Sequence, residues 1–121
     1  MLDLGPAFVS DITEALLLAD INPIPYFTAM IPKQFLSSAE HITKIPEITD
    51  NILTISFHAF SYLQNIKDKV LDLSNTKVEK IASEAFSGNM FTHVKLPDTL
   101  VYIGSNAFYY CSELRVLELS K

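Results

Sequence analysis

The chain has 121 residues, of which 49% are hydrophobic and 19% are charged, and its formal net charge is −5. This composition is typical of one folded domain and excludes an intrinsically disordered chain. An acidic chain without a cluster of Lys and Arg is not expected to bind nucleic acid or an anionic membrane.

The first predicted element is a helix over residues 6–20, which Asn22-Pro23-Ile24-Pro25 ends because proline cannot continue a helix. Its apolar residues recur at intervals of three and four and form one stripe. The stripe consists of Phe8, Ile12, Ala15, Leu16 and Ala19. We expect residues 1–29 to form a helical cap whose stripe covers the fold that follows. The alternative is a partner-binding helix, which Leu17 and Leu18 leave open.

A phrase of the form Ile-x-x-x-Ala-Phe occurs three times after the helix, at residues 55–60, 81–86 and 103–108. Its phenylalanines stand 26 and 22 residues apart, and a weaker copy ends at Phe35. Such a period is typical of a solenoid, whose units bury their apolar sides only against their neighbours. We expect about four coils with one internal phenylalanine in each. The expected aromatic ladder is Phe35, Phe60, Phe86 and Phe108.

The longer pattern around this phrase resembles the BspA-like leucine-rich repeats. Its best copy spans residues 96–119 and contains Leu96-Pro97, Ile103-Gly104, Ala107-Phe108 and Cys111. The resemblance covers about residues 30–121. It implies an α+β fold, a short leucine-rich-repeat solenoid with parallel short strands behind an N-terminal α-helical cap. It also favours a non-catalytic protein-binding module, because stacked repeats build extended faces rather than deep pockets.

Each coil is expected to contribute one short strand to a parallel sheet. These strands are predicted at residues 42–45, 70–73, 93–96 and 116–119. Alternation along a strand and a spacing of about 4.8 Å between strands place the outward side chains in two columns. The outward residues are Val70, Asp72, His93, Lys95, Val116 and Glu118. We predict that this face binds a protein partner. The alternative is a solvated charge ladder worth a few tenths of a kcal/mol per pair.

Two further features bear on binding. Tyr109 and Tyr110 follow the last copy of the phrase, and tyrosine is enriched at interfaces, so both are predicted to contact the partner. The alternative is that their rings lean on the solenoid with wet hydroxyls. Leu117 and Leu119 lie on the last predicted strand, whose edge we expect to be uncovered. This edge gives an alternative function, a structural homo-oligomer or assembly component.

No pattern predicts a catalytic site, a metal site or a cofactor. The three histidines lack ligand spacing, the three glycines form no phosphate loop, and no motif brings Ser, His and a carboxylate together. Gly104 is expected to be the turn residue of the repeat. Cys111 aligns with Leu63 and Asn89 of the earlier copies and is expected to be a buried small thiol. A hydrolase with a concealed site is the remaining enzymatic alternative.

The sequence also suggests a location for the protein. It lacks a basic region before an apolar stretch, and its apolar runs are far shorter than the ~20 residues of a membrane span. A single Cys gives no internal disulfide. We therefore expect a cytoplasmic protein without a membrane or nucleic-acid partner. Short members of the family occur in phage genomes, so a phage-encoded, host-directed or anti-defence protein is a remote alternative.

Overall fold

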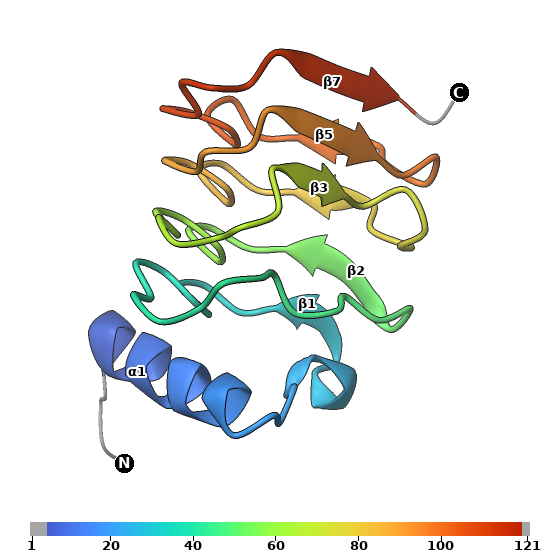
Figure 1. Cartoon of the computed structure of the whole chain (residues 1–121). Helices are drawn as coiled ribbons and strands as arrows, with labels where there is room; N and C mark the ends of the chain where they lie inside the picture. The colour runs from blue at the N-terminus through green and yellow to red at the C-terminus, as the bar shows by residue number, and fades with distance from the viewer. Residues whose placement is uncertain (1–4, 120–121) are drawn as a thin grey trace.

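The computed structural model describes residues 5–119, with side chains from residue 10 onward. The chain winds into a parallel β-solenoid of about four turns, with one helix packed across its first coil (Figure 1). This helix, α1, runs over Gly5–Leu18, and the short 3-10 helix η1 (Ile24–Tyr26) leads from it into the first strand. The predicted leucine-rich-repeat solenoid with its helical cap is confirmed.

The strands form two separate parallel sheets. The first sheet contains β1 (Ala29–Ile31), β2 (Ile52–Ile55), β4 (Lys80–Ile81) and β6 (Tyr102–Ile103), in that order. The second contains β3 (Val70–Asp72), β5 (His93–Leu96) and β7 (Val116–Leu119). The three strands of the second sheet were predicted to within one residue. The strands of the first sheet were not predicted.

The strand predicted at residues 42–45 is wrong. This segment runs beside the start of the second coil and is joined to it by a hydrogen bond from Lys67 N–H to the Thr43 carbonyl oxygen, at 2.8 Å. Pro46 follows directly; it has no N–H to donate and restricts the backbone of Ile45. The first coil therefore supplies no strand to the second sheet, and β3 is left at its edge.

The core contains the predicted aromatic ladder, with one change of register. Phe60 stacks on Phe86 and Phe86 on Phe108, with ring centroids 5.3 and 5.6 Å apart and interplanar angles of 12° and 7°. Phe35 also contacts Phe60, at 5.8 Å, but its ring is turned by 80°. The stack is therefore regular over three coils, and the first coil meets it edge to face.

Backbone hydrogen bonds explain this difference. The N–H groups of Phe60 and Phe86 donate to the alanine carbonyl of the next phrase, at 2.8 and 2.9 Å. In the first coil the equivalent donor is the N–H of Leu36, which bonds to the Ala59 carbonyl at 2.8 Å. Leu36 thus takes the place of the stacked phenylalanine, and Phe35 occupies the place of the small alanine. The predicted fourth copy of the phrase was one residue out of register.

Gly104 is required for a close contact between coils. A Cβ at this position would lie 2.3 Å from the backbone nitrogen of Ser83 in the coil below. The Gly104 carbonyl also accepts from the Ala107 N–H at 3.1 Å, so this residue begins the turn that the repeat predicted, without a left-handed φ. The left-handed glycine of the fold is Gly88, with φ of 74°.

Helix α1 contacts the first coil through a face that was not predicted. Ser10 and Thr13 are buried against the coil, whereas Ile12 is 44% exposed and Ala15 is exposed as well. Ile12, Ala15 and Ala19 of the predicted stripe therefore do not form the contact with the coil. The side chain of Phe8, the first residue of that stripe, lies outside the described residues.

The polar contact has a physical reason. The outer side of a first coil presents backbone groups that have no preceding coil to bond to. Ser10 Oγ donates to the Gln34 carbonyl at 2.8 Å, and Glu14 Oε2 accepts from the His41 N–H at 2.5 Å. The helix caps the coil by supplying these partners, and Leu17 packs against the core beside them.

Candidate functional site

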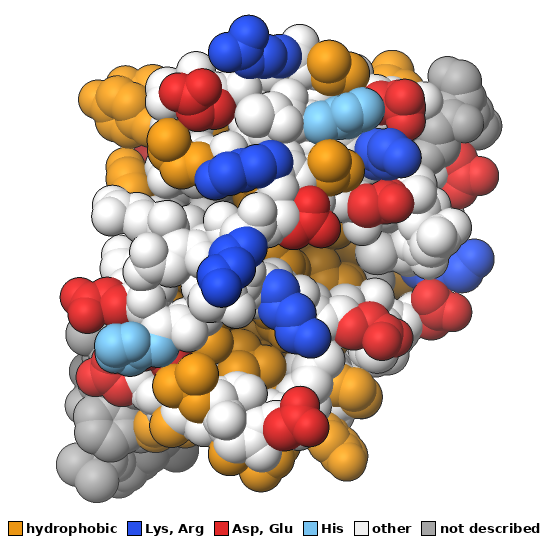
Figure 2. Space-filling model, in the orientation of Figure 1, with side chains coloured by type: hydrophobic (Ala, Val, Ile, Leu, Met, Phe, Trp, Pro, Cys, Tyr) orange, Lys and Arg blue, Asp and Glu red, His pale blue; other side chains and the backbone are white. Residues whose placement is uncertain are grey.

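The outward face of the β3-β5-β7 sheet carries the two predicted columns. Parallel pairing places equivalent residues directly above one another. One column is Val70, His93 and Val116, and the other is Asp72, Lys95 and Glu118. The inward residues between them are buried in the first two strands, where Leu71 and Val94 belong to the core. Figure 2 shows the molecule from this side, with a histidine among hydrophobic, acidic and basic side chains.

His93 lies at the centre of the apolar column. Its side chain is 29% exposed, between Val70 and Val116, which are 38% and 46% exposed. Its Nε2 atom is buried and makes no hydrogen bond, and the Glu118 Oε1 lies 3.9 Å away. A buried polar atom without a hydrogen bond costs free energy, and this nitrogen can gain a bond from a ligand only if the ring turns outward. The sequence analysis predicted that His93 points outward, but it did not predict this unpaired nitrogen.

The three side chains of the charged column, Asp72, Lys95 and Glu118, form no direct ion pair with one another within the described residues. Asp72 Oδ1 instead accepts hydrogen bonds from the Ser74 hydroxyl at 2.6 Å and from the Ser74 N–H at 2.9 Å. These bonds, helped by the charge of Lys95, hold the pKa of Asp72 below its usual 3.8. The column therefore presents ionised groups to solvent.

A groove borders this face on the side of β3 that lacks a neighbouring strand. It has a volume of about 730 Å³ and lies between residues 44–50 of the first coil and β3. Its apolar floor consists of Ile48, Ile66, Leu71, Leu73 and Phe91. Its charged lining consists of Lys44, Glu47, Asp50, Asp68 and Asp72. Figure 2 shows hydrophobic surface at the bottom of this hollow, with charged side chains around it. We call this hollow the β3 groove. Pro46 was the one feature of the sequence that could have indicated it.

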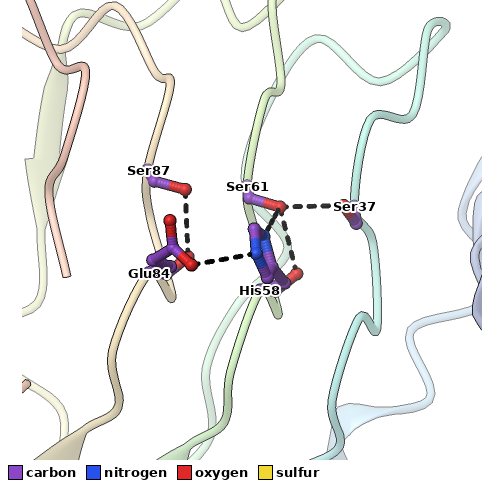
Figure 3. A network of polar contacts seen from close by, with 5 residues as sticks. All are labelled: Ser37, His58, Ser61, Glu84 and Ser87. Carbon is purple, nitrogen blue, oxygen red and sulfur yellow. Dashed lines mark hydrogen bonds and ion pairs between the residues drawn. The ribbon is translucent and has the colours of Figure 1, made fainter. Parts of the chain in front are cut away.

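The structure brings together a serine, a histidine and a carboxylate, although no sequence motif predicted that such residues would meet. His58 Nδ1 lies 2.8 Å from Ser61 Oγ, and His58 Nε2 lies 3.3 Å from Glu84 Oε2 (Figure 3). His58 directly precedes the alanine of the first phrase, and Glu84 directly precedes the alanine of the next. Stacking the coils therefore places these two side chains side by side. Aligning the phrases position by position would have predicted this contact.

This triad has no accessible nucleophile. The Ser61 side chain is completely buried, and its hydroxyl lies 2.8 Å from Ser37 Oγ on the previous coil (Figure 3). A buried serine cannot reach a substrate, and hydrolysis further requires donors for the developing oxyanion. The network instead links three adjacent coils through Ser37, Ser61, His58 and Glu84.

The predicted oligomer edge and the tyrosines make no hydrogen bond to this network among the described residues. Leu117 and Leu119 are 50% and 65% exposed on β7, whereas their equivalents on β5 are buried. Tyr109 and Tyr110 are exposed in the turn between β6 and β7, with ring centroids 4.1 Å apart. The Tyr110 hydroxyl, through a hydrogen bond, raises the pKa of Tyr109. The structure thus places the tyrosines on a turn and not in the strand columns.

Comparison with known proteins identifies the repeat. The family model described as BspA type leucine rich repeat region (6 copies) matches residues 29–121. The chain belongs to the BspA-type leucine-rich repeat family. Searches of curated proteins and of solved structures found no match. Leucine-rich repeats generally serve as non-enzymatic scaffolds for protein interaction.

In the BspA-type repeat the position of Cys111 joins adjacent coils. Cys111 Sγ donates to the Phe86 carbonyl at 3.2 Å, and partial burial raises the pKa of the thiol. At the equivalent position of the previous repeat, Asn89 is fully buried and donates to the carbonyls of Phe60 and Phe86. Cys111 is therefore half-buried and bonded, which fits a structural thiol better than a reactive one.

Two classes of site are not found in the part of the chain that the structure describes. Residues 5–119 contain no group of three or more His, Cys, Asp or Glu side chains that could hold a metal ion. Among the same residues, no helix has the length and apolar character needed to span a bilayer. The strand face, the β3 groove and the exposed β7 strand are candidate binding surfaces of this BspA-type solenoid.

Proposed function

We propose that the chain is a non-catalytic binding module that holds a protein partner against the outward face of the β3-β5-β7 sheet. The observation that carries the proposal is the apolar column, in which the partly exposed ring of His93 lies between the exposed side chains of Val70 and Val116. The Nε2 of His93 is buried without a hydrogen bond, and a partner whose binding turns the ring outward can supply the missing bond. At the same time the two valines lose contact with water, which favours association.

The charged column supports selectivity for one partner. Asp72, Lys95 and Glu118 present an acidic, a basic and an acidic group in register along the stack. Because these side chains do not pair with one another, a partner can meet each of them with the opposite charge. Such complementarity mainly sets specificity and the rate of association. A partner with the charge order basic, acidic and basic fits this column.

The proposal is tested by affinity capture from a lysate of the source organism, followed by mass spectrometry. The bait is the wild-type chain, compared with His93→Glu and with the matched control Ser105→Glu. Ser105 is exposed on a turn away from the strand face, and its substitution adds the same negative charge. A protein held by wild type and control but lost from His93→Glu supports the proposal. A protein held equally by all three chains refutes binding through this face.

A second candidate function is self-association through β7. Leu117 and Leu119 expose apolar surface on this strand, and a two-fold contact would bury both from each copy. This function predicts a molar mass that rises with concentration and a Leu119→Lys variant that stays monomeric. Light scattering that reports a monomer at tens of micromolar for the wild type would rule it out.

A further inference from the structure

The β3 groove runs along a strand edge whose backbone groups are available. Alternate residues of a strand direct their N–H and C=O groups to opposite edges. Leu73 N–H donates to the Lys95 carbonyl at 2.8 Å, so the backbone groups of Leu71 and Leu73 point toward β5. Val70 and Asp72 therefore face the groove. Val70 N–H is bonded to Asp68 Oδ1 at 2.9 Å, which leaves the Val70 carbonyl and the Asp72 N–H for an added strand.

The groove has the dimensions and floor that such a strand needs. Neighbouring strands lie about 4.8 Å apart, and alternate side chains of an added strand would point into the solenoid. Because Pro46 keeps the first coil out of the sheet, the space where that strand would lie is a hollow of about 730 Å³. Its floor, which includes Ile48, Ile66 and Leu71, is apolar and suits inward-pointing aliphatic side chains.

The charge of the groove indicates what the outward side chains of the occupant carry. The lining contains the carboxylates of Glu47, Asp50, Asp68 and Asp72 against the one ammonium group of Lys44. A cationic segment is attracted to this rim, and an anionic segment is repelled. Glu47 and Asp50 are exposed, so their charges can meet those of a bound segment directly.

We propose that the β3 groove binds an extended segment of a partner protein in which Lys or Arg alternates with aliphatic residues. The segment adds as a strand to the edge of β3, so that its backbone bonds to Val70 and Asp72, as in other cases of strand addition. Its aliphatic side chains fill the floor and its basic side chains lie against the acidic rim. The inference rests on the proposed protein-binding function and names the class of partner.

The probe is a short synthetic peptide of alternating lysine and valine, acetylated and amidated at its ends. In the existing sheet the inward Leu71 and Leu73 of β3 turn their backbone toward β5, the next strand of the stack. A peptide that adds parallel to β3 on the groove side should likewise turn the backbone of its inward valines toward β3. Methylating the valine backbone nitrogens removes these donors and keeps the charge. Methylating the lysine backbone nitrogens is the matched control. Binding is followed by fluorescence anisotropy and by amide shifts in NMR spectra.

We expect the peptide to bind and to shift the amide signal of Asp72. Methylation on valine should weaken binding at least about tenfold, as should the double variant Glu47→Lys/Asp50→Lys. Methylation on lysine should change binding little, and so should the control variant Asp11→Lys/Asp98→Lys, whose residues are exposed elsewhere. A peptide of alternating glutamate and valine should not bind. Circular dichroism verifies that both double variants are folded.

Three results would overturn the inference. The lysine–valine peptide could fail to bind, both methylated peptides could bind equally, or the wild-type chain could self-associate in a way that Glu47→Lys/Asp50→Lys abolishes. The last result would assign the groove to a second copy. Failure of the groove is distinct from failure of the strand face. If binding of a partner is lost in His93→Glu but not in Glu47→Lys/Asp50→Lys, the proposed function stands without the groove. If binding is lost only in Glu47→Lys/Asp50→Lys, the proposal that the strand face binds the partner is refuted.

Discussion

Replacing Asn89 by alanine should lower the free energy of unfolding by about 4 kcal/mol. Asn89 Oδ1 accepts from the Leu63 N–H at 3.1 Å, and its Nδ2 donates to the carbonyls of Phe60 and Phe86 at 2.8 Å. Truncation removes all three bonds. The Phe86 carbonyl keeps its bond from Cys111, but the Leu63 N–H and the Phe60 carbonyl lose their bonds to the amide.

The magnitude follows from these two orphaned groups. A buried backbone group that loses its partner costs about 1–3 kcal/mol, so two of them cost about 2–6 kcal/mol. The small cavity left by the amide adds to this. The total is comparable with the cost of truncating a ladder phenylalanine, since Phe86→Ala should cost about 3–5 kcal/mol.

The assay is urea unfolding followed by circular dichroism, with Asn89→Leu as a second variant. Leucine stands at the equivalent position 63, so it suits the site in size but supplies no hydrogen bond. We expect it to remain destabilised because the orphaned groups remain. A loss below about 1 kcal/mol in Asn89→Ala, or full recovery in Asn89→Leu, would refute the reasoning. Packing and not hydrogen bonding would then be the role of this residue.

Two other predictions concern single positions. Gly104→Ala should destabilise the last coil by about 1–3 kcal/mol, because its Cβ would lie 2.3 Å from backbone of Ser83, whereas the exposed control Ser105→Ala should be neutral in the same urea assay. Ser74→Ala should raise the pKa of Asp72 toward 3.8, as measured by NMR titration of its carboxyl carbon. Because the folded pKa is the lower one, the contribution of Asp72 to stability is present above pH 3.8 and is lost as pH falls through the lowered value. An unchanged titration in Ser74→Ala would contradict the assigned cause.

The repeated phrase predicted the fold because a solenoid repeats its inward contacts in register. The positions of Phe60, Phe86 and Phe108 recur with their alanines, and each alanine carbonyl receives the hydrogen bond of the coil before it. Alternation over residues 70–73 and 93–96 separated core from surface correctly, since Leu71 and Val94 are buried. These local patterns survive in the sequence because every coil has to satisfy them.

The sequence did not predict the first sheet or the features that depend on a single coil. The strands β4 and β6 have two residues each, too few to show alternation. The buried face of the helix is polar because Ser10 bonds to a backbone carbonyl of the first coil, a need that hydrophobicity cannot reveal. The β3 groove arises where Pro46 keeps one segment out of the sheet, and its charge becomes visible only when residues from two coils are placed together.

The alternation along β3, β5 and β7 divides two tasks between neighbouring residues. Inward side chains such as Leu71 and Val94 hold the stack together, while Asp72 and Lys95 beside them lie outside the core. Selection can therefore diversify the outer residues independently of the inner ones. One scaffold of this kind can acquire a new ligand by a few surface substitutions without refolding, which makes the repeat a versatile starting point for engineering recognition.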